Sequence, residues 1–194
     1  NETMENLPDA IAVQLNDTHP TMAIPELIRL MMADGVEFEE AFVIAQKTFR
    51  YTNHTVMGEA LEKWPQELLR SVVPEIEHII CLIDYKLRHD PSLNHNPNNF
   101  IINNNIIHMA NLSIYVGSYV NGVAEIHSQI LKDDCFKEWY HVFPERFQNK
   151  TNGITPRRWV GLCNPELTKL VQEKVGGDFV KDLELISKLK DHID

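Results

Sequence analysis

The chain has 194 residues, of which 43% are hydrophobic and 24% are charged, the usual mix of a globular protein. This composition excludes a wholly disordered chain, a collagen and a coiled-coil rod, and three cysteines without a CxxC spacing argue against a disulfide framework and a Cys-rich zinc site. The net charge is −10 at pH 7, so nucleic acids and anionic membranes would repel the protein. No apolar run is long enough to span a bilayer and no signal peptide is recognisable, so we expect a cytoplasmic protein without nucleic-acid or membrane partners.

The first element that we expect is a buried strand. The apolar run Ala10–Leu15 is rich in β-branched residues and lies between Pro8–Asp9 and Asn16–Asp17. The polar residues Asn16–Pro20 follow it immediately. Because α/β sheets bind ligands outside the carboxyl ends of their strands, this cluster is the first candidate site.

Helical periodicity dominates the rest of the chain. The pattern predicts helices over residues 25–33, 37–49, 66–89 (bent or divided at Pro74), 108–131 (broken near Gly117 and Gly122), 165–175 and 179–194. Apolar flanks around consecutive asparagines predict a hairpin within Phe100–Ile107. The sequence thus predicts an α/β chain that is mostly helical.

Four polar clusters separate these apolar elements: Asn16–Pro20, Tyr51–Thr55, Tyr119–Val123 and Gln148–Trp159. They are rich in Asn, Thr, His and Tyr and mostly lack carboxylates. Neutral groups that both donate and accept hydrogen bonds suit an uncharged polyhydroxylated ligand such as a sugar. The same residue types also form caps and turns, which is the structural alternative for these clusters.

Other chemistry is open for some of these residues. Asp17, His19 and His54 are oxygen and nitrogen donors that would suit zinc or iron, although neither a helical HxxxH nor a further carboxylate completes such a site. Structural alternatives are an Asx turn or cap for Asp17 and a buried, hydrogen-bonded imidazole for His54. Arg157 and Arg158 follow a plausible helix start and would suit an anion, unless they are solvated or ion-paired. A GxSxG nucleophile elbow is absent from the sequence.

Four strings in chain order resemble the glycogen phosphorylases, a family that also contains the maltodextrin and starch α-glucan phosphorylases. They are AVQLNDTHP (12–20), YTNHT with EALEKWP (51–55 and 59–65), VNGVAEIHS (120–128) and FQNKTNGITPRRW (147–159). The resemblance extends over about residues 10–183. Chains of this family are several times longer, so the resemblance implies an internal piece of a two-lobe Rossmann-like fold. Residues 1–152 would end the N-terminal lobe and residues 153–194 would begin the C-terminal lobe.

The resemblance also implies an activity. Phosphorylases use inorganic phosphate to cleave a terminal α-1,4-linked glucosyl unit from glycogen or maltodextrin, giving α-glucose 1-phosphate with retention. Their cofactor is pyridoxal phosphate, whose own phosphate group relays the proton. Oxygen atoms of carbonyl and phosphate groups, rather than a protein nucleophile, stabilise the cationic transition state. A cytoplasmic homodimer is expected for the full-length enzyme.

Site residues follow from the same resemblance, position by position. His54 would contact the glucosyl ring, notably through its backbone carbonyl, and Asn152 would bind a glucosyl hydroxyl. Trp159 would lie near the cofactor. The residues expected to line the pocket beside the sugar are Asp17, His19 and Thr55.

The motif with the cofactor lysine is not present in this sequence. We therefore expect the isolated chain to be inactive and to bind no pyridoxal phosphate. The rival interpretations are a free-standing helical module that binds carbohydrate or protein without catalysis, and a metal-dependent hydrolase.

Overall fold

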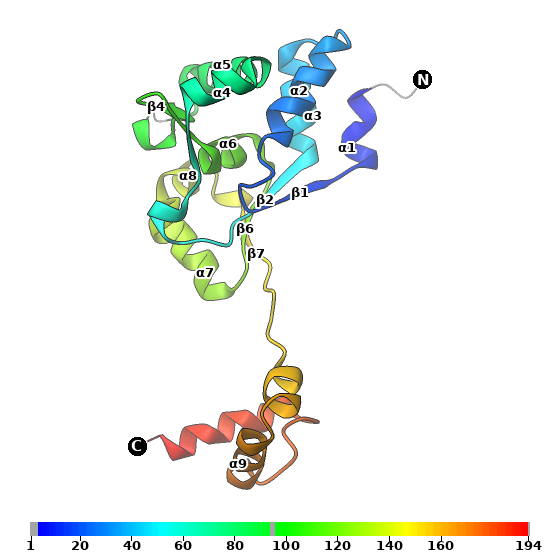
Figure 1. The fold of residues 1–194 in the computed structure, drawn as a ribbon, viewed down its shortest axis with the longest axis vertical. Coiled ribbons are helices and arrows are strands. Elements are labelled where there is room, and N and C mark those ends of the chain that lie inside the picture. Colours follow the sequence, from blue (N-terminus) through cyan, green and yellow to red (C-terminus); the bar gives the residue numbers. More distant parts are fainter. Residues whose placement is uncertain (1–3, 94–95, 194) are drawn as a thin grey trace. The chain divides into compact units, whose positions relative to one another are not determined.

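The structure is a computed structural model that describes residues 4–93 and 96–193 (Figure 1). The chain consists of two compact units, of which the first ends at Thr151 and the second begins at Asn152. Among the helices of the described residues, none has the length and apolar character needed to cross a membrane.

A four-stranded parallel sheet organises the first unit. Its strands lie in the order β1, β2, β6, β7 and span Val13–Asn16, Phe49–Thr52, Val120–Gly122 and Phe147–Asn149. In the register, Asn16 lies opposite Thr52, and Thr52 lies opposite Asn121. Because all the pairings are parallel, the carboxyl ends of these strands lie along one edge of the sheet.

Helices connect these strands, as parallel pairing requires. Helix α1 (Leu7–Ala10) precedes β1. Helices α2 (Ala23–Ala33) and α3 (Phe38–Thr48) connect β1 to β2, and α4 (Gln66–Val72), α5 (Pro74–His89) and α6 (Met109–Val116) lie between β2 and β6. Between β6 and β7 come α7 (Glu125–Ile130), a π-helical turn (Leu131–Cys135) and α8 (Lys137–Val142). Helix α2 packs against α3 and α5, and every residue of α6 is buried. The mostly helical α/β class is confirmed.

The predicted hairpin is confirmed in a smaller antiparallel sheet. Strands β4 (Ile102–Asn103) and β5 (Ile106–His108) pair with each other, and β3 (Lys63–Pro65) pairs with the other side of β5. Asn104 and Asn105 join β4 to β5 with φ angles of 51° and 60°. Asparagine tolerates this left-handed conformation, which two-residue hairpin turns require.

Several predicted boundaries are wrong. The first strand begins at Val13 rather than at Ala10, because Ala10 ends α1. The predicted helix over 37–49 ends at Thr48, since Phe49 already begins β2. The pattern over 108–131 contains strand β6 between two helices. The division at Pro74 is confirmed: α4 ends at Val72 and α5 begins at the proline.

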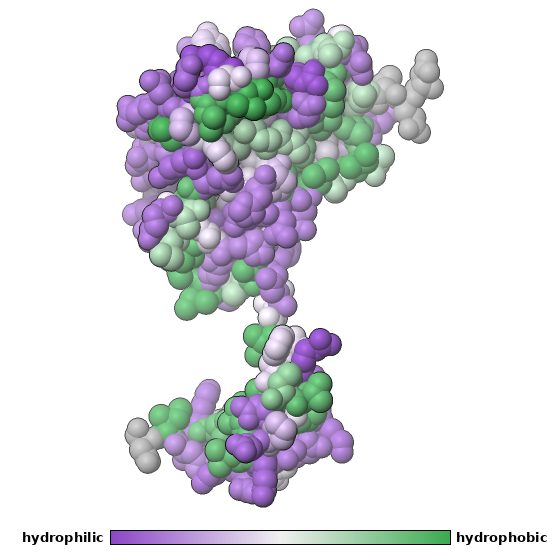
Figure 2. Space-filling view, in the orientation of Figure 1, coloured by the Kyte–Doolittle hydropathy of each residue, from purple (hydrophilic) through white to green (hydrophobic). Residues whose placement is uncertain are grey.

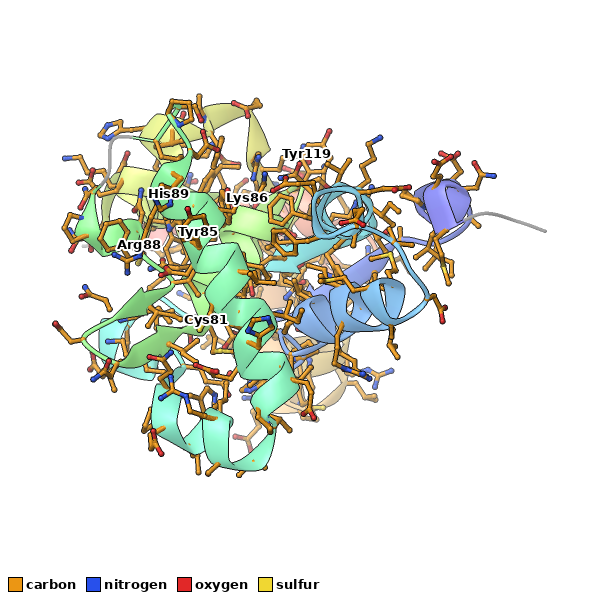
Figure 3. All side chains as sticks on the ribbon, turned by 90° about the horizontal axis from the view of Figure 1, so that it is seen from above. Cys81, Tyr85, Lys86, Arg88, His89 and Tyr119 are labelled. Atoms are coloured by element: carbon orange, nitrogen blue, oxygen red, sulfur yellow. The ribbon has the colours of Figure 1, made fainter. Side chains whose placement is uncertain are left out.

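Side chains of α5, among them Arg88, which Figure 3 labels, contact the residues at the start of the hairpin. Arg88 donates to the Asp84 carboxylate at 2.6 Å and lies 3.8 Å from the centre of the Phe100 ring. Asp84 accepts hydrogen bonds from the amides of Ile101 and Ile102, both at 3.0 Å. This buried carboxylate therefore holds the hairpin against α5.

The second unit is built from three helical segments: a π-helix (Arg157–Leu162), α9 (Pro165–Val175) and a 3-10 helix (Leu183–His192). Asn164 caps α9 by accepting from the amide of Leu167, and Gly176 ends the helix at φ 69°. The buried core of this unit is small, comprising Val171, Val175 and Phe179. Hydrophobic side chains are also exposed, as Figure 2 shows for both units; Trp159 is one of them.

Candidate functional site at the carboxyl ends of the strands

Three of the four polar clusters, and the first residues of the fourth, lie where strands of the parallel sheet end. Strand β1 leads into Asn16–Pro20, β2 ends within Tyr51–Thr55, and β6 ends within Tyr119–Val123. Strand β7 ends at Asn149, within the fourth cluster, of which Gln148–Thr151 belong to the first unit. Segments far apart in the sequence are thus gathered at one edge of the sheet, where α/β proteins bind ligands.

A pocket of about 440 Å³ lies at this edge, and we call it the strand-end pocket. It brings together all three residues predicted to line a sugar site, Asp17, His19 and Thr55. The rest of its lining is Thr18 and the segment Glu59–Lys63. The sequence had placed Asp17 and Thr55 in separate clusters, and the parallel pairing of β1 with β2 accounts for their meeting.

Asp17 connects the first two clusters through its carboxylate. Its backbone has φ 60°, a left-handed conformation that is strained for most residues and tolerated by Asp. One carboxylate oxygen accepts from the amide of Thr18 at 2.7 Å, and the other accepts from the amide of His54 at 3.3 Å. The structural role left open for Asp17 is therefore real, although the carboxylate bridges two loops rather than closing an Asx turn.

Asn53 fixes the peptide units next to His54. Its side chain is fully buried; the amide nitrogen donates to the Tyr51 hydroxyl at 2.8 Å, and the oxygen accepts from the amide of Thr55 at 2.9 Å. Burial strongly raises the pKa of Tyr51, so its hydroxyl stays neutral. The backbone from Asn53 to Thr55 is thus held on both sides of His54.

His54 itself presents an exposed side chain. The interpretation of this residue as a buried, hydrogen-bonded imidazole is therefore wrong, because it follows the end of β2 at the open edge of the sheet. Its backbone amide, by contrast, is bonded to Asp17. The arrangement constrains the main chain at this position more than the ring.

A row of hydrogen-bonded polar side chains connects β1, β2 and β6. Gln14 donates to the Thr52 hydroxyl at 2.6 Å, and that hydroxyl donates to the Asn121 side-chain oxygen at 2.7 Å. The hydroxyl thus accepts one hydrogen bond and donates another in a position that is almost fully buried. This row fixes the relative positions of β1, β2 and β6.

Carboxylates are more frequent in the pocket than the clusters predicted. Glu62 accepts from the Thr18 hydroxyl at 2.8 Å and from the Trp64 indole nitrogen at 3.0 Å. With Asp17 and Glu59 it makes three acidic residues in the lining, against Lys63 and His19. The expectation of a mostly neutral pocket is wrong, because the segment Glu59–Lys63 packs beside the clusters. The family resemblance includes this segment, but no local sequence pattern assigns it to a ligand site.

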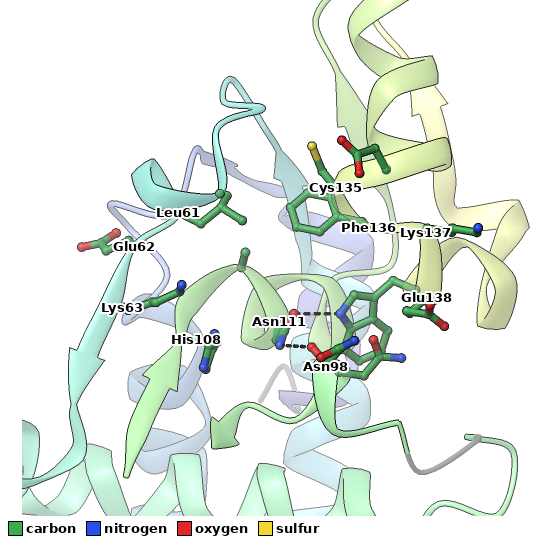
Figure 4. A pocket seen from close by; sticks show the side chains of 15 residues that line it. Leu61, Glu62, Lys63, Asn98, His108, Asn111, Cys135, Phe136, Lys137 and Glu138 are labelled. Carbon is green, nitrogen blue, oxygen red and sulfur yellow. Dashed lines mark hydrogen bonds between the residues drawn. The ribbon is translucent and has the colours of Figure 1, made fainter. Parts of the chain in front are cut away.

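A second pocket, of about 350 Å³, is also lined by part of this segment (Figure 4). Leu61, Glu62 and Lys63 line both pockets and so form a common wall. The floor includes Asn111, which accepts from the Trp139 indole at 2.9 Å and donates to the backbone oxygen of Asn98 at 2.9 Å. Every polar atom of the Asn111 side chain therefore has a protein partner.

The donors proposed for a metal do not form a metal site. Across residues 4–93 and 96–193, no three His, Cys, Asp or Glu side chains are grouped so as to hold a metal ion. Asp17, the carboxylate of the proposed set, already accepts a backbone amide on each oxygen. The set Asp17, His19 and His54 is therefore not supported as a zinc or iron site.

Pyridoxal phosphate does not fit the strand-end pocket. Its phosphate is dianionic, and the pocket presents three carboxylates and a single lysine, a charge balance that repels such a group.

Asn152 and Trp159, the other predicted site residues, belong to the second unit. The Trp159 side chain is 68% exposed. Arg157 donates its Nε–H to the backbone oxygen of Val180 at 2.7 Å, while its side chain stays exposed to solvent.

Comparisons with known proteins agree with these observations. The sequence profile of the carbohydrate phosphorylases matches residues 1–194. The chain is 43% identical to an α-glucan phosphorylase, H isozyme, of Triticum aestivum, over 96% of this chain and 24% of the relative. It is 46% identical to the liver form of glycogen phosphorylase of Bos taurus, over 94% of this chain and 23% of the relative. The brain form of Homo sapiens is 44% identical over 95% of this chain and 23% of the relative. The chain spans about a quarter of the length of these relatives, and it belongs to the carbohydrate phosphorylase family.

Proposed function

We propose that this chain is part of a glycogen or α-glucan phosphorylase, which transfers a terminal α-1,4-linked glucosyl unit to inorganic phosphate and releases α-glucose 1-phosphate. The observation that carries this proposal is the strand-end pocket. Within a chain of the phosphorylase family, it gathers Asp17, His19 and Thr55 at the edge of a parallel sheet. Glycogen or maltodextrin, phosphate and glucose 1-phosphate would be the partners, in a cytoplasmic homodimer.

In this proposal the residues of the pocket bind and orient the sugar. Each carboxylate oxygen of Asp17 and Glu62 already accepts one hydrogen bond and keeps a second lone pair, with which it can accept from a sugar hydroxyl, as the Thr55 hydroxyl also does. The His54 backbone carbonyl faces the glucosyl ring, where a carbonyl dipole stabilises the positive charge that develops in the transition state. The network around Asn53 holds this peptide in place before the sugar binds, so little reorganisation accompanies the reaction.

We also propose the two-lobe assignment, with residues 1–152 ending the N-terminal lobe and residues 153–194 beginning the C-terminal lobe of a Rossmann-like fold. The parallel sheet of the first unit and the division of the chain between Thr151 and Asn152 support it. Asn152 would bind a glucosyl hydroxyl in the complete enzyme. Pyridoxal phosphate would supply proton relay there through its phosphate group, with Trp159 near it and its lysine provided outside this chain.

The experiment compares the 194-residue chain with the full-length protein that contains it. Each is incubated with glycogen and inorganic phosphate, and glucose 1-phosphate is measured with and without added pyridoxal phosphate. We expect release by the full-length protein, none when phosphate is omitted, and none from the isolated chain. Release by the isolated chain would contradict the assignment as a part of the enzyme. A full-length protein that binds maltooligosaccharides in calorimetry but forms no product would favour a carbohydrate-binding module instead.

A further inference from the structure

His127 has a defined proton position that the proposed mechanism does not use. It lies in α7, and its Nδ1 accepts a hydrogen bond from the backbone amide of Val123 at 3.0 Å. Its Nε2 lies 3.2 Å from the Asn53 side-chain oxygen. A backbone N–H only donates and an amide oxygen only accepts, so the ring must carry its single proton on Nε2. Burial lowers the pKa of His127, which favours this neutral form.

The orientation of Asn53 is settled by the other contacts of its side chain. Its oxygen also accepts from the amide of Thr55, which cannot bond to an NH₂ group. Its nitrogen donates to the Tyr51 hydroxyl. Exchanging the oxygen with the nitrogen would therefore set donor against donor at both Thr55 and His127, and the Nε2–H of His127 is left as the matching donor.

We propose that His127, as the neutral Nε2–H tautomer, is a positioning residue that fixes the peptide units around His54 by holding the side-chain oxygen of Asn53. This proposal rests on the proposed function, since it concerns the backbone carbonyl that faces the glucosyl ring. His127 is not part of the lining of the strand-end pocket, and it acts on the loop through Asn53 and through the backbone of Thr55. The hydrogen bond to the amide of Val123 fixes the ring at the end of β6. Because the ring also binds Asn53, His127 fixes the loop after β2 relative to β6.

The first test needs no activity and uses the 194-residue chain. Nitrogen-15 chemical shifts of the His127 ring at pH 7.5 report which nitrogen carries the proton. We expect a protonated Nε2 and an unprotonated Nδ1, together with slow hydrogen exchange of the Thr55 amide. In His127→Leu the Thr55 amide should exchange at least about tenfold faster, since the shared acceptor is no longer held. A proton on Nδ1, or unchanged Thr55 exchange in a folded variant, would overturn the proposal.

The second test measures phosphorolysis by the full-length protein. His127→Leu should lower kcat about 10- to 100-fold, whereas His127→Gln should recover most of the loss because its amide also offers a donor and an acceptor. The matched control is His78→Leu, which replaces an exposed histidine of α5 and should leave kcat unchanged. Rescue by glutamine separates a hydrogen-bonding role from simple packing, since leucine also fills the space.

A double-mutant cycle tests whether the effect passes through Asn53. In an Asn53→Ala background, His127→Leu should change kcat by less than about twofold, because the partner has already been removed. A further tenfold loss in that background would show that His127 acts independently and would overturn the proposal. If the wild-type full-length protein forms no glucose 1-phosphate, the proposed function fails, whereas the tautomer and the Thr55 exchange still decide the role of His127.

Discussion

The Asp17 carboxylate accepts a hydrogen bond from the backbone amide of His54 at 3.3 Å, although 37 residues separate the two in the sequence. The contact joins the loop after β1 to the loop after β2 at the edge of the parallel sheet. It engages the main chain of His54 and leaves the side chain exposed. A residue predicted to line the sugar pocket thus also shapes the loop that carries His54.

Replacing Asp17 should separate its hydrogen bonds from its unusual backbone. Asp17→Ala removes both carboxylate contacts and places alanine at φ 60°, so we expect a loss of about 2–4 kcal/mol in the free energy of unfolding. Asp17→Asn tolerates the left-handed conformation and keeps one acceptor oxygen, but its NH₂ group would face the other backbone amide, so its loss should be smaller than that of alanine, about 1–2 kcal/mol. Urea unfolding of the 194-residue chain measures both. Equal losses in the two variants would contradict this account.

Replacing Thr52 with valine, which has nearly the same shape, should still lower the free energy of unfolding. Thr52→Val removes the hydroxyl and leaves Gln14 and Asn121 without their partner in an almost fully buried position. We expect a loss of about 1–3 kcal/mol, the usual cost of unsatisfied buried polar groups. Thr52→Ser keeps the hydroxyl and is the matched control, with a smaller loss. The measurement is urea unfolding. If the two variants differ in midpoint but not in the slope of the unfolding free energy against urea concentration, the difference is one of stability and is assigned to the hydrogen bonds.

Gly122 should not accept even alanine. A Cβ atom there would lie 2.5 Å from the hydroxyl oxygen and 2.9 Å from the Cα and backbone nitrogen of Ser128. The backbone of α7 would have to move, so Gly122→Ala should cost about 1–3 kcal/mol or more. Gly58→Ala is the control because a Cβ at that position meets nothing within 4 Å. Thermal unfolding of the two variants side by side measures the contrast, and equal melting temperatures would refute it.

The stability of the chain should depend on pH through His108. Burial lowers the pKa of this half-buried histidine, and the nearby Lys63 lowers it further. The unfolded state, with a histidine pKa of about 6.5, therefore binds more protons than the folded state once the pH falls below about 7. The free energy of unfolding is therefore not reduced by His108 above about pH 7, and it falls as the pH decreases towards the pKa of His108 in the folded state. His108→Gln should reduce the slope of stability against pH between about 7 and 5, whereas His78→Gln, at an exposed position, should not.

The elements predicted correctly from the sequence are those with strong local signals. Pro74 divides α4 from α5, Asn164 caps α9, and Asn104 with Asn105 turns the hairpin. Strands β2 and β6 were missed because they span only three or four residues and pass directly from or into polar clusters. Such strands depend on their neighbours in the sheet rather than on their own pattern.

The candidate site shows the same limit. Its polar clusters were recognised, since the residues that follow a strand are contiguous in the sequence. The wall formed by Glu59–Lys63 was not, because nothing local shows that this segment packs against His19 and Thr55. The acidic character of the pocket therefore became visible only with the fold.

The last prediction concerns the His54 side chain in the full-length enzyme with saturating pyridoxal phosphate. Its ring is exposed while its backbone is held by Asp17 and by the network of Asn53, so the peptide carbonyl is the better candidate for the contact with the glucosyl ring. His54→Asn should then keep substantial activity with an unchanged pH dependence, since the backbone of the loop is preserved. A general acid or base would behave differently, because its removal costs about 10²–10⁴-fold in rate. The measurement is kcat against pH for the variant and the wild type. A loss of more than about three decades, with an intact circular dichroism spectrum and bound cofactor, would place the imidazole itself among the catalytic groups.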